Sequence, residues 1–284
     1  MDFKKLVGIA VLLLIIFAFK DSIRYILEVD PTFFLLSVLS YFSLNILLTY
    51  RMLYLFKKLG ENSSFSSVFS AHMAAIVTSD VTPGRSGYLA FPKFGEKYGL
   101  NFRVSTASLF STQAVEMIVK VFGSSLAILY LLSPEELVAI SLPAFLTVLA
   151  SLYLWTDAIP IKFKRIEKIR EYSKLTRRHI PELLFLTVIG WFLVGAQWFF
   201  VSKAMNLNLS FFESMLLQAL LSLAMFIPLT PAGAGFFEGG TAFVFSTFGV
   251  SPEKAIAFAL LIRASTIIAD SPGIYFILSR ERVS

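Results

Sequence analysis

Apolar residues lie along this chain in runs of about 20, instead of alternating with polar residues. A helix needs about 20 apolar residues to cross the hydrocarbon core of a bilayer, so runs of this length predict transmembrane helices. The pattern therefore predicts an all-α polytopic membrane protein that forms a single domain over 1–284 and has about six full spans. The expected spans cover residues 6–19, 31–56, 104–132, 137–156, 183–205 and 255–278.

Two further apolar segments are interrupted by proline and glycine, and both breaks contain the pattern Thr-Pro-x-x-x-Gly, at 82–87 and 230–235. Unpaired backbone N–H and C=O groups cost roughly several kcal/mol each in lipid, so an interrupted helix persists only where protein or a watery cavity satisfies them. We interpret both segments as re-entrant hairpins that shape a polar path. The residues that define the breaks are Thr82, Pro83, Gly84 and Gly87 in the first and Pro228, Thr230, Pro231, Gly233 and Gly235 in the second.

Basic residues indicate on which side of the membrane each loop lies. Arg51, Lys57 and Lys58 mark the end of the second span, and the stretch 160–180 is the clearest basic segment of the chain. The resulting topology places 19 of the 25 Lys and Arg residues, and both termini, in the cytoplasm. We therefore expect a multi-pass protein of the plasma (inner) membrane. The net charge of +6 fits this topology better than nucleic-acid binding, and the basic segment permits a helix on anionic lipid headgroups.

The two halves of the chain repeat one order of elements. Each half contains a span, an interrupted hairpin and a span that carries a charge. In the charge-based topology the first hairpin enters the membrane from the cytoplasm and the second from outside. The segments 31–132 and 183–278 are therefore predicted to form an inverted repeat, which is typical of transporters. The alternative is two ordinary kinks with an accidental similarity.

Several charged residues lie within or beside the expected spans. A charge at the bilayer centre costs at least about 2.5–3.5 kcal/mol, so such side chains should face the protein interior and be paired. Glu116 and Lys120 are four residues apart on one helical face and can pair. The full set of candidates for a substrate path is Arg85, Glu116, Lys120, Glu238, Arg263 and Asp270. The alternative is a static ion network that joins the helices.

Other polar residues have simpler interpretations. At the tip of the first hairpin, Arg85 is placed to meet a lipid phosphate, or else extends to the membrane surface. We expect His72 to hydrogen-bond within its own hairpin. Asn45, Gln197 and Gln218 are interpreted as contacts between helices.

The composition excludes several kinds of site. The chain has no cysteine, so it has no disulfides or thiolate nucleophiles, and its two histidines cannot build a His-rich metal site. The carboxylates Glu116, Glu238 and Asp270 are scattered over separate segments, unlike the clustered acids of metal-dependent lipid-modifying enzymes. We expect no cofactor and no enzymatic activity.

The two breaks carry a resemblance to a known family. Residues 82–87, Thr-Pro-Gly-Arg-Ser-Gly, and 228–238, which match Pro-x-x-Pro-x-Gly-x-Gly-x-x-Glu, resemble the flippase-like transmembrane family that includes the membrane part of lysylphosphatidylglycerol synthase, the multiple peptide resistance factor. The chain departs from the family in having alanine at 232 and Tyr88 in place of a glutamate. The resemblance covers almost the whole chain.

This resemblance implies lipid translocation between leaflets, with roles carried over to Arg85, Glu238 and Arg263. It does not imply lysine transfer, because that reaction belongs to a separate soluble domain, and we expect no such domain after Ser284. The leading hypothesis is a stand-alone flippase or scramblase for a phospholipid, an aminoacyl-phosphatidylglycerol or a polyprenyl-phosphate-linked lipid. The alternative is a membrane-embedded lipid-modifying enzyme or a partner subunit of one. The expected partners are membrane lipids with anionic headgroups and no nucleic acid, and a homo-oligomer is left open.

Overall fold

The structure, a computed structural model, describes residues 20–159, 167–223 and 233–279. These ranges contain helices and no strand, so the predicted all-α class is confirmed for them. The expected first span, 6–19, lies outside the described residues. So do Pro228, Thr230 and Pro231 of the second break.

Helices and short 3-10 turns follow one another along the chain. In the first half they are α2 (Lys20–Leu27), α3 (Pro31–Lys58), α4 (Phe65–Asp80), η1 (Ser86–Ala90), α5 (Phe91–Lys97), α6 (Phe102–Leu131), η2 (Pro134–Ile140) and α7 (Ser141–Trp155). In the second half they are α8 (Glu167–Thr176), η3 (Arg177–His179), α9 (Ile180–Ala204), α10 (Phe211–Ser222), α11 (Phe236–Ser246), α12 (Pro252–Asp270) and α13 (Pro272–Leu278).

Local sequence sets where the helices begin. The Asp30 side chain accepts hydrogen bonds from the first free N–H groups of α3, and Asn101 does the same for α6. Ser210 and Glu213 form a reciprocal capping box at the start of α10. Because these side chains supply acceptors that the helix itself lacks, they fix the starting points near the positions that hydropathy predicts.

Four helical segments are long and apolar enough to cross a membrane, and α12 with α13 makes a fifth if this bent pair is one span. The four are Pro31–Lys58, Phe102–Leu131, Pro134–Trp155 and Ile169–Ala204. The chain is therefore a multi-pass membrane protein. On α7 the large side chains Leu142, Phe145, Leu146 and Val148 are more than half exposed, as expected for a surface that faces lipid.

The last span differs from the sequence-based expectation of one continuous helix over 255–278. The structure ends α12 at Asp270, and α13 continues at an angle of 45° after Pro272. Proline has no N–H and its ring clashes with the carbonyl of the preceding turn, which explains the bend. The bend brings α13 against α4 so closely that a Cβ on Gly273 would lie 2.1 Å from the carbonyl oxygen of Met73.

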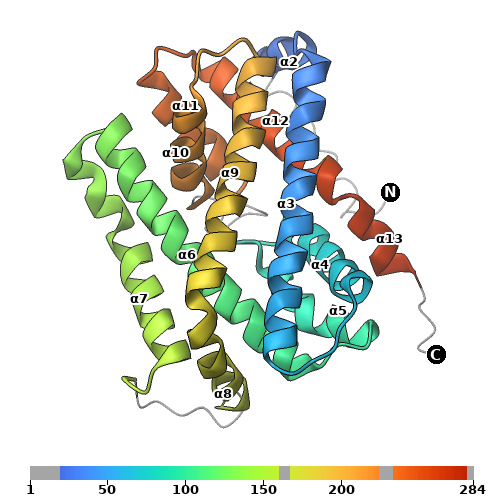
Figure 1. Cartoon of the computed structure of the whole chain (residues 1–284). Coiled ribbons are helices and arrows are strands. Elements are labelled where there is room, and N and C mark those ends of the chain that lie inside the picture. Colours follow the sequence, from blue (N-terminus) through green and yellow to red (C-terminus); the bar gives the residue numbers. More distant parts are fainter. Residues whose placement is uncertain (1–19, 160–166, 224–232, 280–284) are drawn as a thin grey trace, which may run out of the picture.

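The long helices α3 and α9 lie side by side through the centre of the molecule (Figure 1). They are antiparallel, because the N–H of Asp30, just before α3, donates to the carbonyl of Ala204 at the end of α9. Helices α4 and α5 lie toward the end of the molecule where α8 lies, whereas α10 and α11 lie toward the end where α2 lies (Figure 1). The helices that flank the two breaks therefore lie toward opposite ends of the bundle.

The basic segment 160–180 contains the helix α8, which packs against α6 and α7. Arg170 is buried there and donates to the carbonyls of Tyr153 and Thr156 at the C-terminal end of α7 and to that of Ile159 in the segment that follows. Thr176 donates to Ser111 of α6. One face of this basic helix is thus occupied by protein contacts.

Candidate functional site

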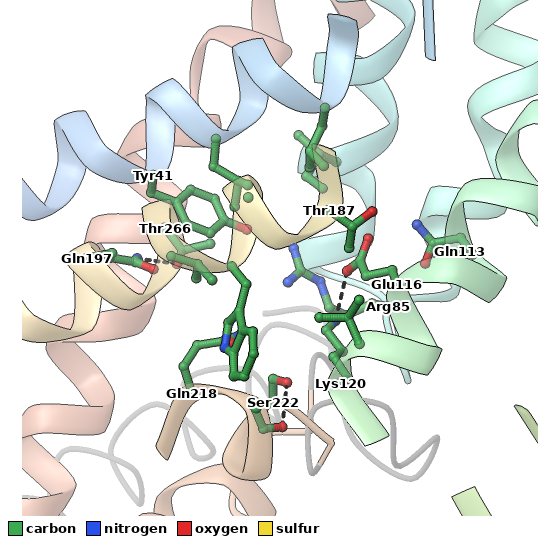
Figure 2. Close-up of a pocket in the computed structure, with 18 of the residues that line it drawn as sticks. Tyr41, Arg85, Gln113, Glu116, Lys120, Thr187, Gln197, Gln218, Ser222 and Thr266 are labelled. Carbon is green, nitrogen blue, oxygen red and sulfur yellow. Dashed lines mark hydrogen bonds and ion pairs between the residues drawn. The ribbon is translucent and has the colours of Figure 1, made fainter. Parts of the chain in front are cut away.

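A cavity of about 150 Å³ lies between the central helices. It is far larger than the roughly 10–15 Å³ that one water molecule needs, so it can hold water within the membrane-spanning part. Residues of α3, α4, α6, α9, α10 and α12 line it, together with Arg85 of the first break and Tyr88, which follows that break. Its polar lining comprises Tyr41, Arg51, Ser79, Arg85, Tyr88, Gln113, Glu116, Lys120, Thr187, Gln197, Gln218, Ser222 and Thr266. Figure 2 shows Glu116, Lys120 and Thr187 on one side of the cavity and Tyr41, Gln197 and Thr266 on the other.

A charged cluster on α3 and α6 forms one wall of the cavity. Glu116 accepts hydrogen bonds from Lys120, with Nζ–Oε1 at 2.8 Å, and from Arg51, with Nη2–Oε2 at 3.1 Å. Arg51 also donates to Thr187 of α9 at 2.8 Å. The predicted pairing of Glu116 with Lys120 is confirmed, and Arg51 extends it into a bridge between three helices.

The position of Arg51 corrects the sequence analysis. Arg51 was expected to mark the cytoplasmic end of the second span, but its side chain is only 2% exposed and lines the cavity. Lys57 and Lys58, by contrast, lie at the end of α3. Counting positive charges near a span does not measure their depth, so a buried arginine one or two turns from the helix end looks like a surface charge.

The first break presents Arg85 to the cavity. Gly84 and Arg85 have φ values of 57° and 56°, a left-handed conformation that costs a non-glycine residue about 1–3 kcal/mol. The Arg85 guanidinium pairs with Asp80, Nη2–Oδ1 2.9 Å, and lies 3.4 Å from the Ser79 hydroxyl. Its side chain is 18% exposed and lines the cavity.

Thr82 and Gly87 hold this turn in place. The N–H of Gly87 donates to the Thr82 hydroxyl oxygen at 2.7 Å, and that hydroxyl donates in turn to the carbonyl of Thr78 at 3.1 Å. A Cβ on Gly87 would lie 2.5 Å from the same carbonyl oxygen, so no larger residue fits without a shift of the backbone. The Thr-Pro-x-x-x-Gly pattern therefore has a structural cause in the first break.

The second break has a different geometry. Glu238 accepts from the N–H of Gly235 at 2.6 Å and pairs with Arg263 of α12, whose guanidinium lies 5.1 Å from the centre of the Phe237 ring. These two candidate charges are therefore paired with each other, as expected for charges within the membrane. Neither residue lines the cavity.

Asp270 joins a third polar group, behind the cavity wall. It accepts from the Asn45 amide at 2.5 Å, and Asn45 in turn contacts His72 at 3.4 Å. The other ring nitrogen of His72 lies 2.8 Å from the Tyr88 hydroxyl, which confirms that His72 hydrogen-bonds within its hairpin. Gln197 donates to Ser265 and Thr266 and so links α9 with α12, as expected for a helix contact.

No set of three His, Asp or Glu side chains converges on a possible metal position within 20–159, 167–223 and 233–279. The cavity is instead lined by charged side chains. Three basic side chains, Arg51, Arg85 and Lys120, and one acidic side chain, Glu116, line it. An excess of positive charge in a buried, partly apolar cavity favours an anionic group such as a phosphate.

Comparison with known proteins places the chain in a family. Residues 5–271 match the family described as the lysylphosphatidylglycerol synthase TM region. The chain belongs to this family. The UPF0104 membrane protein MJ1078 of Methanocaldococcus jannaschii is 28% identical to it over 110 residues, which are 37% of this chain and 47% of the relative. The match thus spans about half the length of that curated relative, and the family resemblance read from the two breaks is confirmed.

In this member of the lysylphosphatidylglycerol synthase transmembrane family, the candidate charges fall into separate places. Arg85, Glu116 and Lys120 meet at the cavity, whereas Glu238, Arg263 and Asp270 lie outside its lining. Sequence reasoning missed Arg51 and Asp80 as members of the charged groups. For Asp80 a signal was available, because it stands five residues before Arg85, just ahead of the turn.

Proposed function

We propose that this protein moves lipids with anionic headgroups between the two leaflets, as a flippase or scramblase. The headgroup passes through the cavity while the acyl chains stay in the surrounding lipid. The observation that carries this proposal is the buried cavity with three basic side chains and one acidic side chain. Membership in a synthase transmembrane family supports it, and the matched region is the transmembrane one.

We also propose that 31–132 and 183–278 form an inverted repeat. In support, each half has a long α-helix, two short α-helices and a further long element: α3, α4, α5 and α6, then α9, α10, α11 and α12 with α13. The first short helix of each half packs on the last element of the other half. Thus α4 packs on α13, and α10 packs on α6. Such exchange of contacts is expected for two units related by a two-fold axis in the membrane plane.

Orientation and environment belong to the same proposal. We place both termini and the basic segment 160–180 in the cytoplasm, in the plasma (inner) membrane of the cell. The first hairpin then opens to the cytoplasm and the second to the outside. The lipid is a phospholipid, an aminoacyl-phosphatidylglycerol or a polyprenyl-phosphate-linked lipid, and the protein works without a nucleic-acid partner or cofactor, as a monomer or homo-oligomer.

A reconstitution experiment tests the proposed transport. Purified protein is placed in vesicles that contain trace fluorescent phosphatidylglycerol or phosphatidylcholine, and dithionite is added to bleach the outer leaflet. Wild-type protein should make the inner pool of phosphatidylglycerol accessible, and faster than that of phosphatidylcholine. Arg51→Gln, which removes a cavity charge but keeps a polar side chain, should slow this by about tenfold, which is about 1.4 kcal/mol.

The control is Arg103→Gln, which removes an exposed arginine at the start of α6 and should leave the rate unchanged. Lipids are extracted afterwards and separated by chromatography. A chemically altered lipid with no transport would favour the lipid-modifying enzyme. Equal rates for wild type and Arg51→Gln would contradict a headgroup path through this cavity.

A further inference from the structure

Two buried aspartates from distant parts of the chain meet beside the cavity. Asp80 is the last residue of α4, and Asp270 is the last residue of α12. Their carboxyl groups lie within hydrogen-bonding contact of each other. Both stand at C-terminal helix ends, where the partial negative charge of the helix dipole opposes a carboxylate, so the arrangement needs compensation.

On one side of this acid pair, the hydrogen bonds run in one direction. The Asn45 amide nitrogen donates to Oδ1 of Asp270, so the Asn45 carbonyl oxygen is left to accept from Nε2 of His72. The other ring nitrogen of His72, Nδ1, lies 2.8 Å from the Tyr88 hydroxyl, and a neutral imidazole that donates through Nε2 and accepts through Nδ1 satisfies both contacts. This chain of donors brings no positive charge to Asp270.

On the other side, the cation in contact with the pair is Arg85, which donates to Oδ1 of Asp80. Tyr41 of α3 lies against Arg85, and the charge of Arg263 on α12 acts on Asp80 from farther away. Arg51 and Glu116, of opposite charge, act on His72 and Tyr88 from the cavity wall. The Arg85 guanidinium thus lies against a pair of carboxyl groups.

The second oxygen of each aspartate lacks a hydrogen-bond donor. Oδ2 of Asp80 and Oδ2 of Asp270 are buried, and neither receives a hydrogen bond from any donor in the described parts of the chain. A carboxylate oxygen can only accept, so two ionised groups in contact would leave both oxygens unsatisfied and repelling each other. One proton between them supplies the missing donor and removes one negative charge.

We propose that Asp80 and Asp270 bind one proton between them, and that this proton and an anionic headgroup in the cavity bind together. The inference rests on the proposed transport function and names what couples to it. In uptake, a proton from water forms an O–H bond with one of the two carboxylates, and on release to the other side that bond breaks. The protein thereby carries a proton with each anionic lipid.

Arg85 links the binding of the proton to the binding of the anionic headgroup. With both carboxylates ionised, their two negative charges hold the guanidinium and repel an anion. With one proton bound, the pair carries one charge, and Arg85, which lines the cavity, can share its donors with a phosphate oxygen. By thermodynamic linkage each ligand then raises the affinity for the other.

Infrared spectroscopy of the purified protein at neutral pH tests the shared proton without any need for transport. Wild type should show the C=O stretching band of a buried protonated carboxyl group. Asp80→Asn and Asp270→Asn should each abolish it, because the new amide N–H replaces the proton and leaves a carboxylate. The matched control Asp157→Asn, at an exposed position, should keep it. A wild type without this band, or a band that persists in both variants, would overturn the inference.

A pH gradient tests the coupling. If one proton moves with each singly charged lipid, a gradient of one pH unit should shift labelled phosphatidylglycerol about tenfold toward the alkaline leaflet. Vesicles with Asp270→Asn should show equal amounts of labelled phosphatidylglycerol in the two leaflets under the same gradient. If wild type distributes the lipid equally between the two leaflets despite the gradient, the proposed coupling is wrong and the transport proposal stands. If no lipid crosses at all, the transport proposal fails, and the infrared band alone decides the proton site.

Discussion

The two breaks share a short sequence pattern, but they do different things with their charged residues. In the first break, Thr82 and Gly87 pack the turn onto the end of α4, and Arg85 points its guanidinium to the cavity. In the second, Glu238 accepts from the N–H of Gly235 and pairs with Arg263, away from the cavity lining.

The glycines show the same difference. Gly87 is required because a carbonyl oxygen lies 2.5 Å from where its Cβ would be, whereas no heavy atom of the described residues lies within 4 Å of a Cβ on Gly235. Gly235 instead has a φ of 87°, a conformation that other residues rarely adopt. A sequence pattern can thus repeat while its physical cause changes from close packing to backbone conformation.

The largest expected effect lies at the second break. Arg263→Gln removes the ion-pair partner of the buried Glu238 carboxylate and should lower the free energy of unfolding by about 3–5 kcal/mol, and Glu238→Gln, which removes one partner of Arg263, should also lower it. The double variant should lose less than the sum of the two, because it leaves no unpaired charge. Thermal unfolding in detergent micelles measures both. Arg24→Gln, which breaks an exposed ion pair with Glu28, should leave the melting temperature unchanged. Additive losses in the double variant would contradict the pairing.

The next effect separates the two glycines. Gly87→Ala should destabilise the protein by about 2–3 kcal/mol, because its Cβ overlaps backbone that cannot move freely. Gly235→Ala should cost about 1–2 kcal/mol, from backbone conformation alone. Gly239→Ala has open space and lies within α11, so it should stabilise by roughly 0.5–1 kcal/mol. Melting temperatures in the order Gly239→Ala, wild type, Gly235→Ala, Gly87→Ala would support the distinction, and a milder effect at 87 than at 235 would refute it.

The smallest effect concerns the hydroxyl in the first break. Thr82→Val keeps the shape of the side chain but removes the acceptor for the Gly87 N–H, and should cost about 1 kcal/mol. Thr82→Ser restores the hydroxyl and should recover most of the loss. The melting temperatures of the two variants provide the test, and equal values would show that the hydroxyl contributes nothing to the turn.

Several local features were predictable from the sequence. The ends of α3, α6 and α9 lie within a few residues of the expected spans, because run length and capping residues act over short distances. The pair Glu116–Lys120 follows from helical spacing. The bend of the last span also had a signal, since Ser-Pro-Gly at 271–273 is a helix-breaking sequence.

The sequence by itself determined that this chain folds into membrane helices with two interrupted segments, because hydrophobic run length and Pro-Gly breaks act locally. Only the tertiary structure decided which charges on different helices meet. Arg51 contacts Glu116, which is 65 residues away in the sequence, and Thr187, which is 136 residues away. Asn45 contacts Asp270, which is 225 residues away. These partners depend on how α3, α6, α9 and α12 pack, and no spacing along one helix encodes that packing.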